Sequence, residues 1–390
     1  MVISNAIVCD EDGEREVDIR IKDGIITEMA KGLTCSDVVD AKGAYFLPLL
    51  RDLNVRLQDS ILNSKNIKRI SDEALLGGVG QVVLNADSNP AIDSEIVLEF
   101  AQNGLHDLDG ADVELMLNAL KEDATLSNIA ILLKRGATNP YMSTIAKNDV
   151  AIKIAEYCKM YDVELFCKAE DNSLIQSGVM LDGDISSKLG LAGIPDLSEV
   201  LHVSRMIEIA RHFKIKILFK SIASPRSISL ITQAKKDGVG VRCEVSIHHL
   251  VNSDATCENF NTTAKLDPPL ASSADMLELQ KALKNGEIDV LTTLHQPSSP
   301  VNKEVAFYDA DYGCEALADA MPLYYTKLVK SNMITMSELL KLTTNDSKIE
   351  VGKDISAMLL NVDNSYKVTN SQSLYNDETL YGVLEQTFTS

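Results

Sequence analysis

The chain has 390 residues, 45% of them hydrophobic, which suits one large domain and a second, smaller one built around sizeable apolar cores. The formal net charge of −20 argues against a protein that binds nucleic acids or anionic membranes through general electrostatics. No run of about 18 apolar residues occurs, and the N-terminus lacks the basic start of a signal peptide, so we expect a cytoplasmic protein.

Both ends of the chain favour β-structure. An alternating segment near the N-terminus contains Asp23-Gly24, a dipeptide typical of a tight hairpin turn. Residues 357–362 form a second apolar segment of strand length. We expect residues 1–47 and 350–390 to combine in one small, discontinuous β-sandwich domain, and residues 48–349 to form the main domain between them.

Apolar strands and amphipathic helices alternate along the main domain. The expected strands are residues 49–55, 81–85, 113–117, 129–133, 163–167, 215–219, 239–245 and 290–293. One expected helix, residues 198–213, has an apolar face made of Val200, Leu201, Val203, Ile207 and Ala210. Another begins at Ser224-Pro225, because serine caps helices well and proline suits the first helical position. This rhythm is typical of an α/β protein with a (β/α)8 barrel.

The first expected barrel strand, residues 49–55, ends in alternating polar side chains. Asn54, Arg56 and Gln58 are two residues apart and therefore share one face of the strand. In a (β/α)8 barrel the carboxyl ends of the strands open onto the functional pocket. These three side chains are therefore expected to line that pocket.

The segment around these residues resembles a signature of the dihydroorotases and related cyclic amidohydrolases, Pro-Gly-Phe-Ile-Asp-x-His-x-His-x-Arg. In this chain the segment begins at Pro48 and ends at Gln58. Five further segments follow the family's order and spacing, namely residues 88–95, 188–195, 244–250, 265–270 and 286–289. The resemblance covers nearly the whole chain and implies a (β/α)8 barrel of the amidohydrolase type with a small β-sandwich from both chain ends.

In the family that this signature resembles, the two histidines hold zinc and the arginine binds the substrate carboxylate. The corresponding residues here are Asn54, Arg56 and Gln58. A neutral amide oxygen is a weak metal ligand, and a guanidinium keeps its proton and repels a cation. The signature thus keeps its apolar frame and loses its metal ligands.

The other catalytic positions that the resemblance assigns have changed as well. Lys168 and Ser221 stand where the family carries zinc-binding histidines, and Leu294 replaces the catalytic aspartate. The bridging ligand falls within residues 138–144, where neither Asp nor Lys occurs. Asp87 replaces a substrate-binding asparagine, which disfavours an anionic ligand. We therefore expect no catalytic residues, no metal and no cofactor, with zinc present only if the site has been rebuilt.

Two of the remaining pocket residues have a chemical and a structural interpretation. A desolvated lysine at a barrel mouth can form a Schiff base, which is the chemical interpretation of Lys168. The simpler interpretation is that this lysine replaces the charge of the ion and pairs with a neighbouring acid, Glu170, Asp171 or Asp87. His295 keeps its position in the family frame, but a lone imidazole gives little metal affinity, so we expect a buried structural role.

The other histidines also have ordinary interpretations. His248 and His249 are expected on a strand, where adjacent residues face opposite sides, as packing and hydrogen-bonding groups. His202 and His212 fall in the expected helix and His106 in a loop, and all three are expected to face solvent. None of them predicts a metal site.

The resemblance favours a dihydroorotase-like protein without catalytic activity. It implies a structural partner of aspartate carbamoyltransferase in pyrimidine biosynthesis, and we expect this partner together with a homo-oligomer, most simply a dimer. Two alternatives remain open. One is an active cyclic amidohydrolase with a rebuilt zinc site, and the other is a small-molecule-binding regulatory module that uses the pocket of Asn54, Arg56, Asp87 and Lys168.

Overall fold

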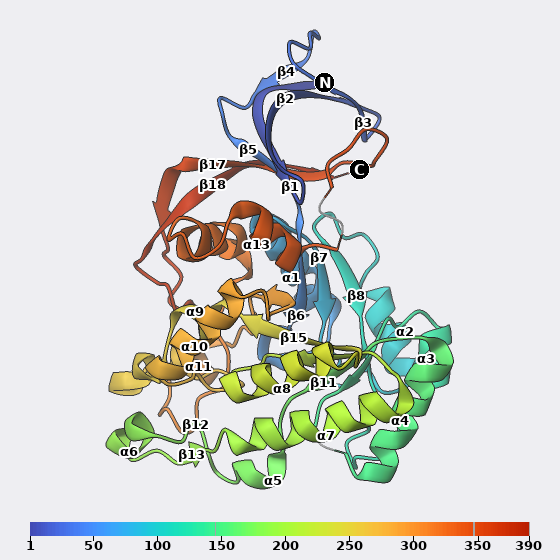
Figure 1. Cartoon of the computed structure of the whole chain (residues 1–390), viewed down its shortest axis with the longest axis vertical. Coiled ribbons are helices and arrows are strands. Elements are labelled where there is room, and N and C mark those ends of the chain that lie inside the picture. Colours follow the sequence, from blue (N-terminus) through green and yellow to red (C-terminus); the bar gives the residue numbers. More distant parts are fainter. Residues whose placement is uncertain (145, 346–347, 390) are drawn as a thin grey trace.

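The computed structural model describes residues 1–144, 146–345 and 348–389. Figure 1 shows a helix-covered barrel and, at its upper end, a curved β-sheet domain in which both chain termini lie. The predicted fold, a (β/α)8 barrel with a small β-sandwich from both chain ends, is confirmed. Every helix in these ranges is too short or too polar to span a bilayer.

The small domain is a seven-stranded sheet in the described part of the chain, with strand order β18-β17-β5-β1-β2-β3 and β4 beside β1. Its strands are β1 (Val2–Asp10), β2 (Gly13–Lys22), β3 (Ile25–Ala30), β4 (Val38–Asp40), β5 (Tyr45–Pro48), β17 (Ser356–Lys367) and β18 (Thr379–Thr389). The β2–β3 hairpin turns at Asp23 and Gly24, whose positive φ values of 52° and 75° fit the predicted tight turn. Phe46 and Phe388, with ring centroids 5.9 Å apart, join the two chain ends in the core of this domain.

The barrel is built from parallel strands that pair in chain order. They are β6 (Leu50–Val55), β7 (Val79–Leu84), β8 (Asp112–Leu115) with its continuation β9 (Leu117–Asn118), β10 (Pro140–Met142), β11 (Leu165–Lys168), β14 (Ile217–Lys220), β15 (Val241–Ser246) and β16 (Val290–Thr292). A parallel bridge between Val55 and His295 closes the circle, since the Arg56 N–H donates to the His295 carbonyl oxygen (2.9 Å). The carboxyl ends of all these strands therefore meet at one mouth.

The longer helices cover the barrel. They are α1 (Ser64–Leu76), α2 (Glu95–Asn103), α3 (Ile129–Lys134), α4 (Asn148–Tyr161), α7 (Leu197–Phe213), α8 (Pro225–Lys236), α10 (Ser273–Lys284), α12 (Ala320–Tyr324) with a π-helical continuation (Tyr325–Val329), and α13 (Met336–Thr343). As predicted, α8 begins with proline directly after Ser224. In Figure 1, α13 lies between the barrel and the small domain.

Shorter elements build the loops at the mouth and around it. They are α5 (Asn172–Ile175), β12 (Met180–Leu181), α6 (Asp184–Leu189), β13 (Gly193–Ile194), α9 (Ile247–Val251), α11 (Pro300–Lys303), and the 3₁₀ turns Gln58–Ser60, Asp254–Phe260, Thr262–Ala264 and Leu317–Asp319. The pair β12–β13 forms a small separate sheet.

Two predictions about elements are wrong. Residues 129–133 form helix α3 and not a strand, because Ile129 and Leu132 are buried three residues apart while Ile131 is 40% exposed, a helical pattern. The barrel strand that follows α3 is β10, and its three residues are too few to show the alternating pattern of a strand. Leu201 is 47% exposed and does not join the apolar face of α7 that Val203 and Ile207 form.

Candidate functional site

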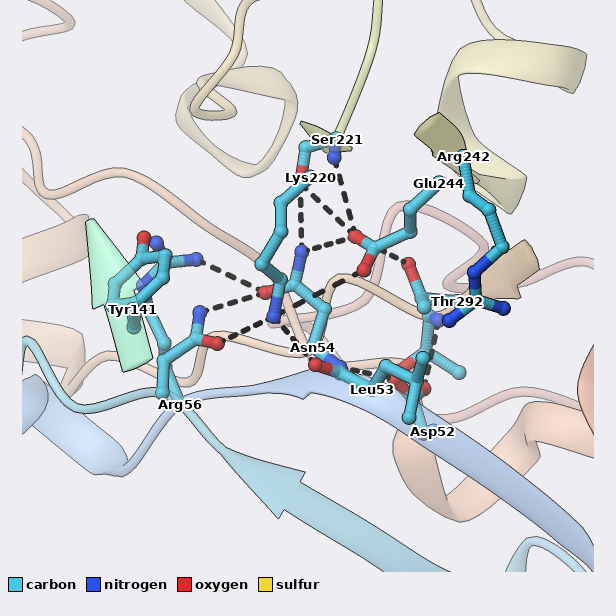
Figure 2. A network of polar contacts seen from close by, with 12 residues as sticks. Asp52, Leu53, Asn54, Arg56, Tyr141, Lys220, Ser221, Arg242, Glu244 and Thr292 are labelled. Carbon is cyan, nitrogen blue, oxygen red and sulfur yellow. Dashed lines mark hydrogen bonds and ion pairs between the residues drawn. The ribbon is translucent and has the colours of Figure 1, made fainter. Parts of the chain in front are cut away.

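The Asn54 side chain lies at the centre of a polar network that joins four barrel strands at the mouth (Figure 2). Its amide nitrogen donates to Ser221 Oγ (2.7 Å) and to Glu244 Oε1 (2.5 Å). Its carbonyl oxygen accepts from Asn85 Nδ2 (2.8 Å). Asn54 is 1% exposed, so its amide is buried and fully used by neighbouring side chains.

Lys220, the last residue of β14, is a buried cation in this network that sequence reasoning missed. Its ammonium donates to the Leu53 carbonyl oxygen (2.5 Å) and to Asn85 Oδ1 (2.7 Å), and it lies 3.9 Å from Glu244 Oε2. Burial lowers the pKa of Lys220 to about 8, although the neighbouring Glu244 favours the charged form. A lysine that ends the apolar run of a barrel strand is the signal that could have identified it.

Arg56 pairs with Asp87 beside this network. The guanidinium Nη2 lies 3.2 Å from Asp87 Oδ2, and the Tyr141 hydroxyl donates to the same oxygen (3.4 Å). Burial opposes the charge of Arg56, but the Asp87 carboxylate raises its pKa overall, so the residue remains a cation. The side chain of Asp87 is thus engaged by Arg56 and not by Lys168.

Lys168, at the end of β11, forms a second charged cluster with two carboxylates. Its ammonium lies 2.8 Å from Asp267 Oδ2 and 3.2 Å from Glu170 Oε2. The predicted pairing with Glu170 is confirmed, whereas Asp171 instead caps α5 by accepting from the Ser173 N–H (3.0 Å). Burial opposes the charge of Lys168, but these two carboxylates, Asp267 first, raise its pKa overall. Asp267 was missed, although it lies within the family-like segment 265–270.

The loop that carries Ser221 is held from the neighbouring helix. Ser221 has a positive φ of 53°, and both its N–H and its hydroxyl contact Glu244 Oε1 at 3.3 Å. Glu199, in the first turn of α7, accepts from the Ala223 N–H (2.9 Å) and the Ser224 N–H (3.0 Å). Burial raises the pKa of Glu199 to about 7. Helix α7 therefore fixes the position of the Ser221 loop.

Gln58, Leu294 and His295 lie outside the Asn54 network and the Lys168 cluster, and His295 Nε2 lies 3.4 Å from Glu73 Oε2. Gln58 Oε1 accepts from Arg69 Nη1 (2.7 Å) on helix α1. Leu294 is 1% exposed and has a positive φ of 49°. His295 Nδ1 accepts the N–H groups of residues 316 and 317 (3.3 and 3.2 Å), and burial lowers its pKa to about 3. The histidine is therefore a neutral, buried group, as its structural interpretation predicted.

Two predictions about the other histidines are wrong, whereas His106 and His212 are exposed as predicted. His248 and His249 lie in helix α9 and not on a strand, and both are buried. His202 is 1% exposed, so its predicted exposure to solvent is wrong. Its Nε2 lies 3.4 Å from Cys167 Sγ, because this face of α7 packs on β11. Burial lowers the pKa of His202 to about 4.

The residues at the mouth do not fit the zinc centre of the family. The Asn54 amide oxygen is occupied by a neighbouring amide, and three cations, Arg56, Lys168 and Lys220, lie at the strand ends. Nowhere in residues 1–144, 146–345 and 348–389 are three or more His, Cys, Asp or Glu side chains grouped as metal ligands. Each of these cations is paired with at least one carboxylate, which is then not free to bind a metal ion.

The fold defines the class of protein. It superposes on an L-hydantoinase (dihydropyrimidinase) from Arthrobacter aurescens with a TM-score of 0.85, covering 100% of this chain and 94% of the other at 20% identity. A D-hydantoinase gives a TM-score of 0.86 with 100% and 93% coverage at 18% identity. The chain thus has the hydantoinase fold, a barrel with a terminal β-sandwich, while no protein-family model matches its sequence.

Sequence relatives identify the family. A dihydroorotase from Elusimicrobium minutum is 34% identical, and one from Caldanaerobacter subterraneus subsp. tengcongensis is 31% identical. Each alignment covers 99% of this chain and 95% of the relative. The chain belongs to the dihydroorotase family, which confirms the resemblance noted in its sequence.

Proposed function

We propose that this chain is a non-catalytic member of the dihydroorotase family that serves as a structural partner of aspartate carbamoyltransferase in pyrimidine biosynthesis. The observation that supports the loss of catalysis is the closed network at the mouth. Asn54 and Ser221, at two positions where the family carries zinc ligands, hydrogen-bond to each other across 2.7 Å. These two side chains are therefore not available as metal ligands.

The buried ammonium of Lys220 supports the same proposal. Lys220 donates to an oxygen on β6 and to Asn85 directly after β7, and it lies beside Glu244 on β15, so one ammonium links the strand ends that a metal would otherwise join. Leu294 supplies no carboxylate that could move a proton to a leaving amide nitrogen. The network therefore stabilises the barrel but provides neither a metal-bound nucleophile nor a general base at the family's position.

The proposed partner rests on the family resemblance and on the intact fold. The whole chain aligns with its relatives, and the barrel retains a continuous apolar core from β6 to β16. A protein that keeps its fold while its catalytic positions change is suited to an assembly role, in which the outer surface binds the partner. We also propose a homo-oligomer, most simply a dimer.

A second candidate function is that of an active cyclic amidohydrolase. The names of the sequence relatives favour this function. Relatives that are 31–34% identical over nearly their whole length are called dihydroorotases. This function requires metal ligands other than those of the family signature. It predicts bound zinc and turnover of dihydroorotate.

Metal content and activity, measured on one preparation, separate the two candidates. The chain is expressed with added zinc, freed of loosely bound metal, and measured by elemental mass spectrometry, with a zinc-dependent dihydroorotase treated in parallel. Our proposal predicts zinc at background level and no hydrolysis of dihydroorotate. Stoichiometric zinc together with turnover would overturn it in favour of the active enzyme.

The partner is tested by gel filtration with light scattering. The purified chain is mixed at micromolar concentration with aspartate carbamoyltransferase from the same organism, and each protein is also run alone. We expect one species whose mass exceeds that of either protein, and a chain that is itself a dimer when alone. Separate elution of the two proteins would contradict the proposed partner.

A further inference from the structure

A polar recess lies beside the cluster of Lys168, Glu170 and Asp267. It has a cavity volume of about 290 Å³ and is bounded on its other sides by α5, β13 and the loop that contains Tyr312. The side chains of Lys168, Glu170 and Asp267 are 19%, 16% and 23% exposed, so all three charged groups line a sheltered space that solvent reaches. Such concave, partly buried sites with a few converging polar groups are typical of small-molecule sites.

The charges of this recess select a kind of ligand. Two carboxylates lie within 3.2 Å of one ammonium, so the cluster is neutral or carries one negative charge. A dianion would meet repulsion from Glu170 and Asp267. A zwitterion suits the cluster. Its ammonium can pair with the carboxylates of Glu170 and Asp267, and its carboxylate can pair with the ammonium of Lys168.

An apolar slot adjoins the recess and shares Glu170, Ile194 and Pro269 with it. The slot has a cavity volume of about 60 Å³. Its walls include the apolar side chains of Leu181, Pro225, Pro268 and Ala271, together with the carboxylates of Asp196, Glu199 and Asp275. A ligand whose charged end lies at Lys168 can therefore extend an apolar side chain past Ile194. Burial of an aliphatic side chain there contributes to binding through the hydrophobic effect.

We propose that this recess and slot form a binding site for an aliphatic α-amino acid. The ammonium of the ligand lies between Glu170 and Asp267, its carboxylate pairs with Lys168, and its side chain enters the slot. Binding involves no covalent step. The site goes beyond the proposed assembly role, since it needs no second protein.

The probe for this site is L-leucine, titrated into the full chain by isothermal calorimetry. Two analogues each lack one charge: 3-methylbutylamine has no carboxylate, and 4-methylpentanoate has no ammonium. Because hydrogen bonds between charged groups contribute roughly 1.5–3 kcal/mol, we expect each analogue to bind about 10- to 100-fold more weakly than leucine. Absence of measurable leucine binding, or equal binding of leucine and 3-methylbutylamine, would overturn the proposal.

Three variants test where the ligand binds. Lys168→Met removes the partner of the carboxylate and should weaken leucine binding about tenfold or more. Lys188→Met is the matched control, because Lys188 is 65% exposed and pairs with Glu258 outside the recess. Ile175→Trp fills the recess without changing a charge and should abolish binding even if Lys168→Met fails to fold. Wild-type affinity in Ile175→Trp would overturn the location, and this result is independent of the test with aspartate carbamoyltransferase.

Discussion

Lys220 carries a positive charge into the interior of the barrel, where its side chain is only 2% exposed. An isolated ammonium in such a place is strongly unfavourable, and it persists because oxygens of Leu53, Asn85 and Glu244 surround it. The same Glu244 accepts hydrogen bonds from Asn54. Each member of the network therefore depends on the others, and removal of one leaves buried groups without partners.

Replacement of this ammonium is the first prediction. Lys220→Met keeps most of the side-chain volume but leaves the Glu244 carboxylate and the Leu53 carbonyl without their cation. We expect the free energy of unfolding to fall by about 3–5 kcal/mol, the usual effect of breaking a buried charge pair. Urea unfolding followed by circular dichroism measures this change.

The control for this prediction is Lys216→Met, at the residue directly before β14 begins. Lys216 is 64% exposed and lies 3.6 Å from the 91% exposed Asp162, so its loss should change stability by less than about 0.5 kcal/mol. If Lys220→Met were as stable as this control, the buried ammonium would not hold the strand ends together.

At the scale of elements, helix α9 joins the barrel to the segment between β17 and β18. His248 Nδ1 lies 2.9 Å from the Tyr375 hydroxyl, and its Nε2 lies 3.3 Å from Cys314 Sγ. Burial lowers the pKa of His248 to about 3, and the adjacent His249 acts in the same direction. In the folded protein His248 therefore makes these contacts as a neutral imidazole.

The neutral state of His248 in the fold gives a prediction about how stability depends on pH. Below pH 6.5 the unfolded chain binds a proton at His248, whereas the folded chain does not until about pH 3, so this group makes stability fall as the pH falls. Between pH 6 and 4.5 the wild type should lose stability more steeply than His248→Gln, by about 1.4 kcal/mol per pH unit. Urea unfolding at a series of pH values measures both slopes.

Tyr375→Phe separates the titration from the loss of a hydrogen bond. This variant keeps His248 and removes the hydroxyl that contacts it, so stability should drop by about 1 kcal/mol at every pH while the slope stays that of the wild type. Equal slopes in the wild type and His248→Gln would mean that the folded protein protonates this imidazole.

Elements set by local sequence were predictable, and contacts between elements were not. The turn at Asp23-Gly24 and the start of α8 at Pro225 follow from the conformations that these residues prefer. Residues 129–133 were misassigned because a short apolar run fits a helix and a strand equally well. Lys220 was missed because its partners come from three other strands, which only the closed barrel brings together.

In the candidate site too, the position of a side chain could be predicted from the sequence, whereas its partner could not. The positions of Asn54 and Arg56 at the end of the first barrel strand follow from the period of the strand. The pairing of Lys168 with Asp267 does not, since 98 residues separate them in the chain and the loop after α9 decides which acid reaches the lysine. A sequence pattern gives the face of a side chain but not the partner that it meets there.

At the scale of the whole molecule, the two domains share one sheet. Alternate residues of β17 face different cores, because Leu359 packs in the small domain while Met358 and Leu360 pack with the barrel. In β5, Phe46 packs in the small domain, and the next residue, Leu47, packs with the barrel. Strands that are buried on both faces couple the domains, so the chain should unfold as one cooperative unit.

The last prediction tests this coupling with Phe388→Ala. Phe388 is 6% exposed and contacts the small-domain core, far along the chain from the barrel strands, so its loss should lower stability by about 3–5 kcal/mol. Val351→Ala, at a 55% exposed position near the same domain, is the control and should change little. Because β5 and β17 contribute to both cores, we expect Phe388→Ala to unfold in a single transition, at a lower urea concentration than the wild type. Hydrogen exchange should be faster in both β1 and β6. Two separate transitions, with β6 still protected after the small domain has unfolded, would show that the barrel does not depend on the sheet formed by the chain ends.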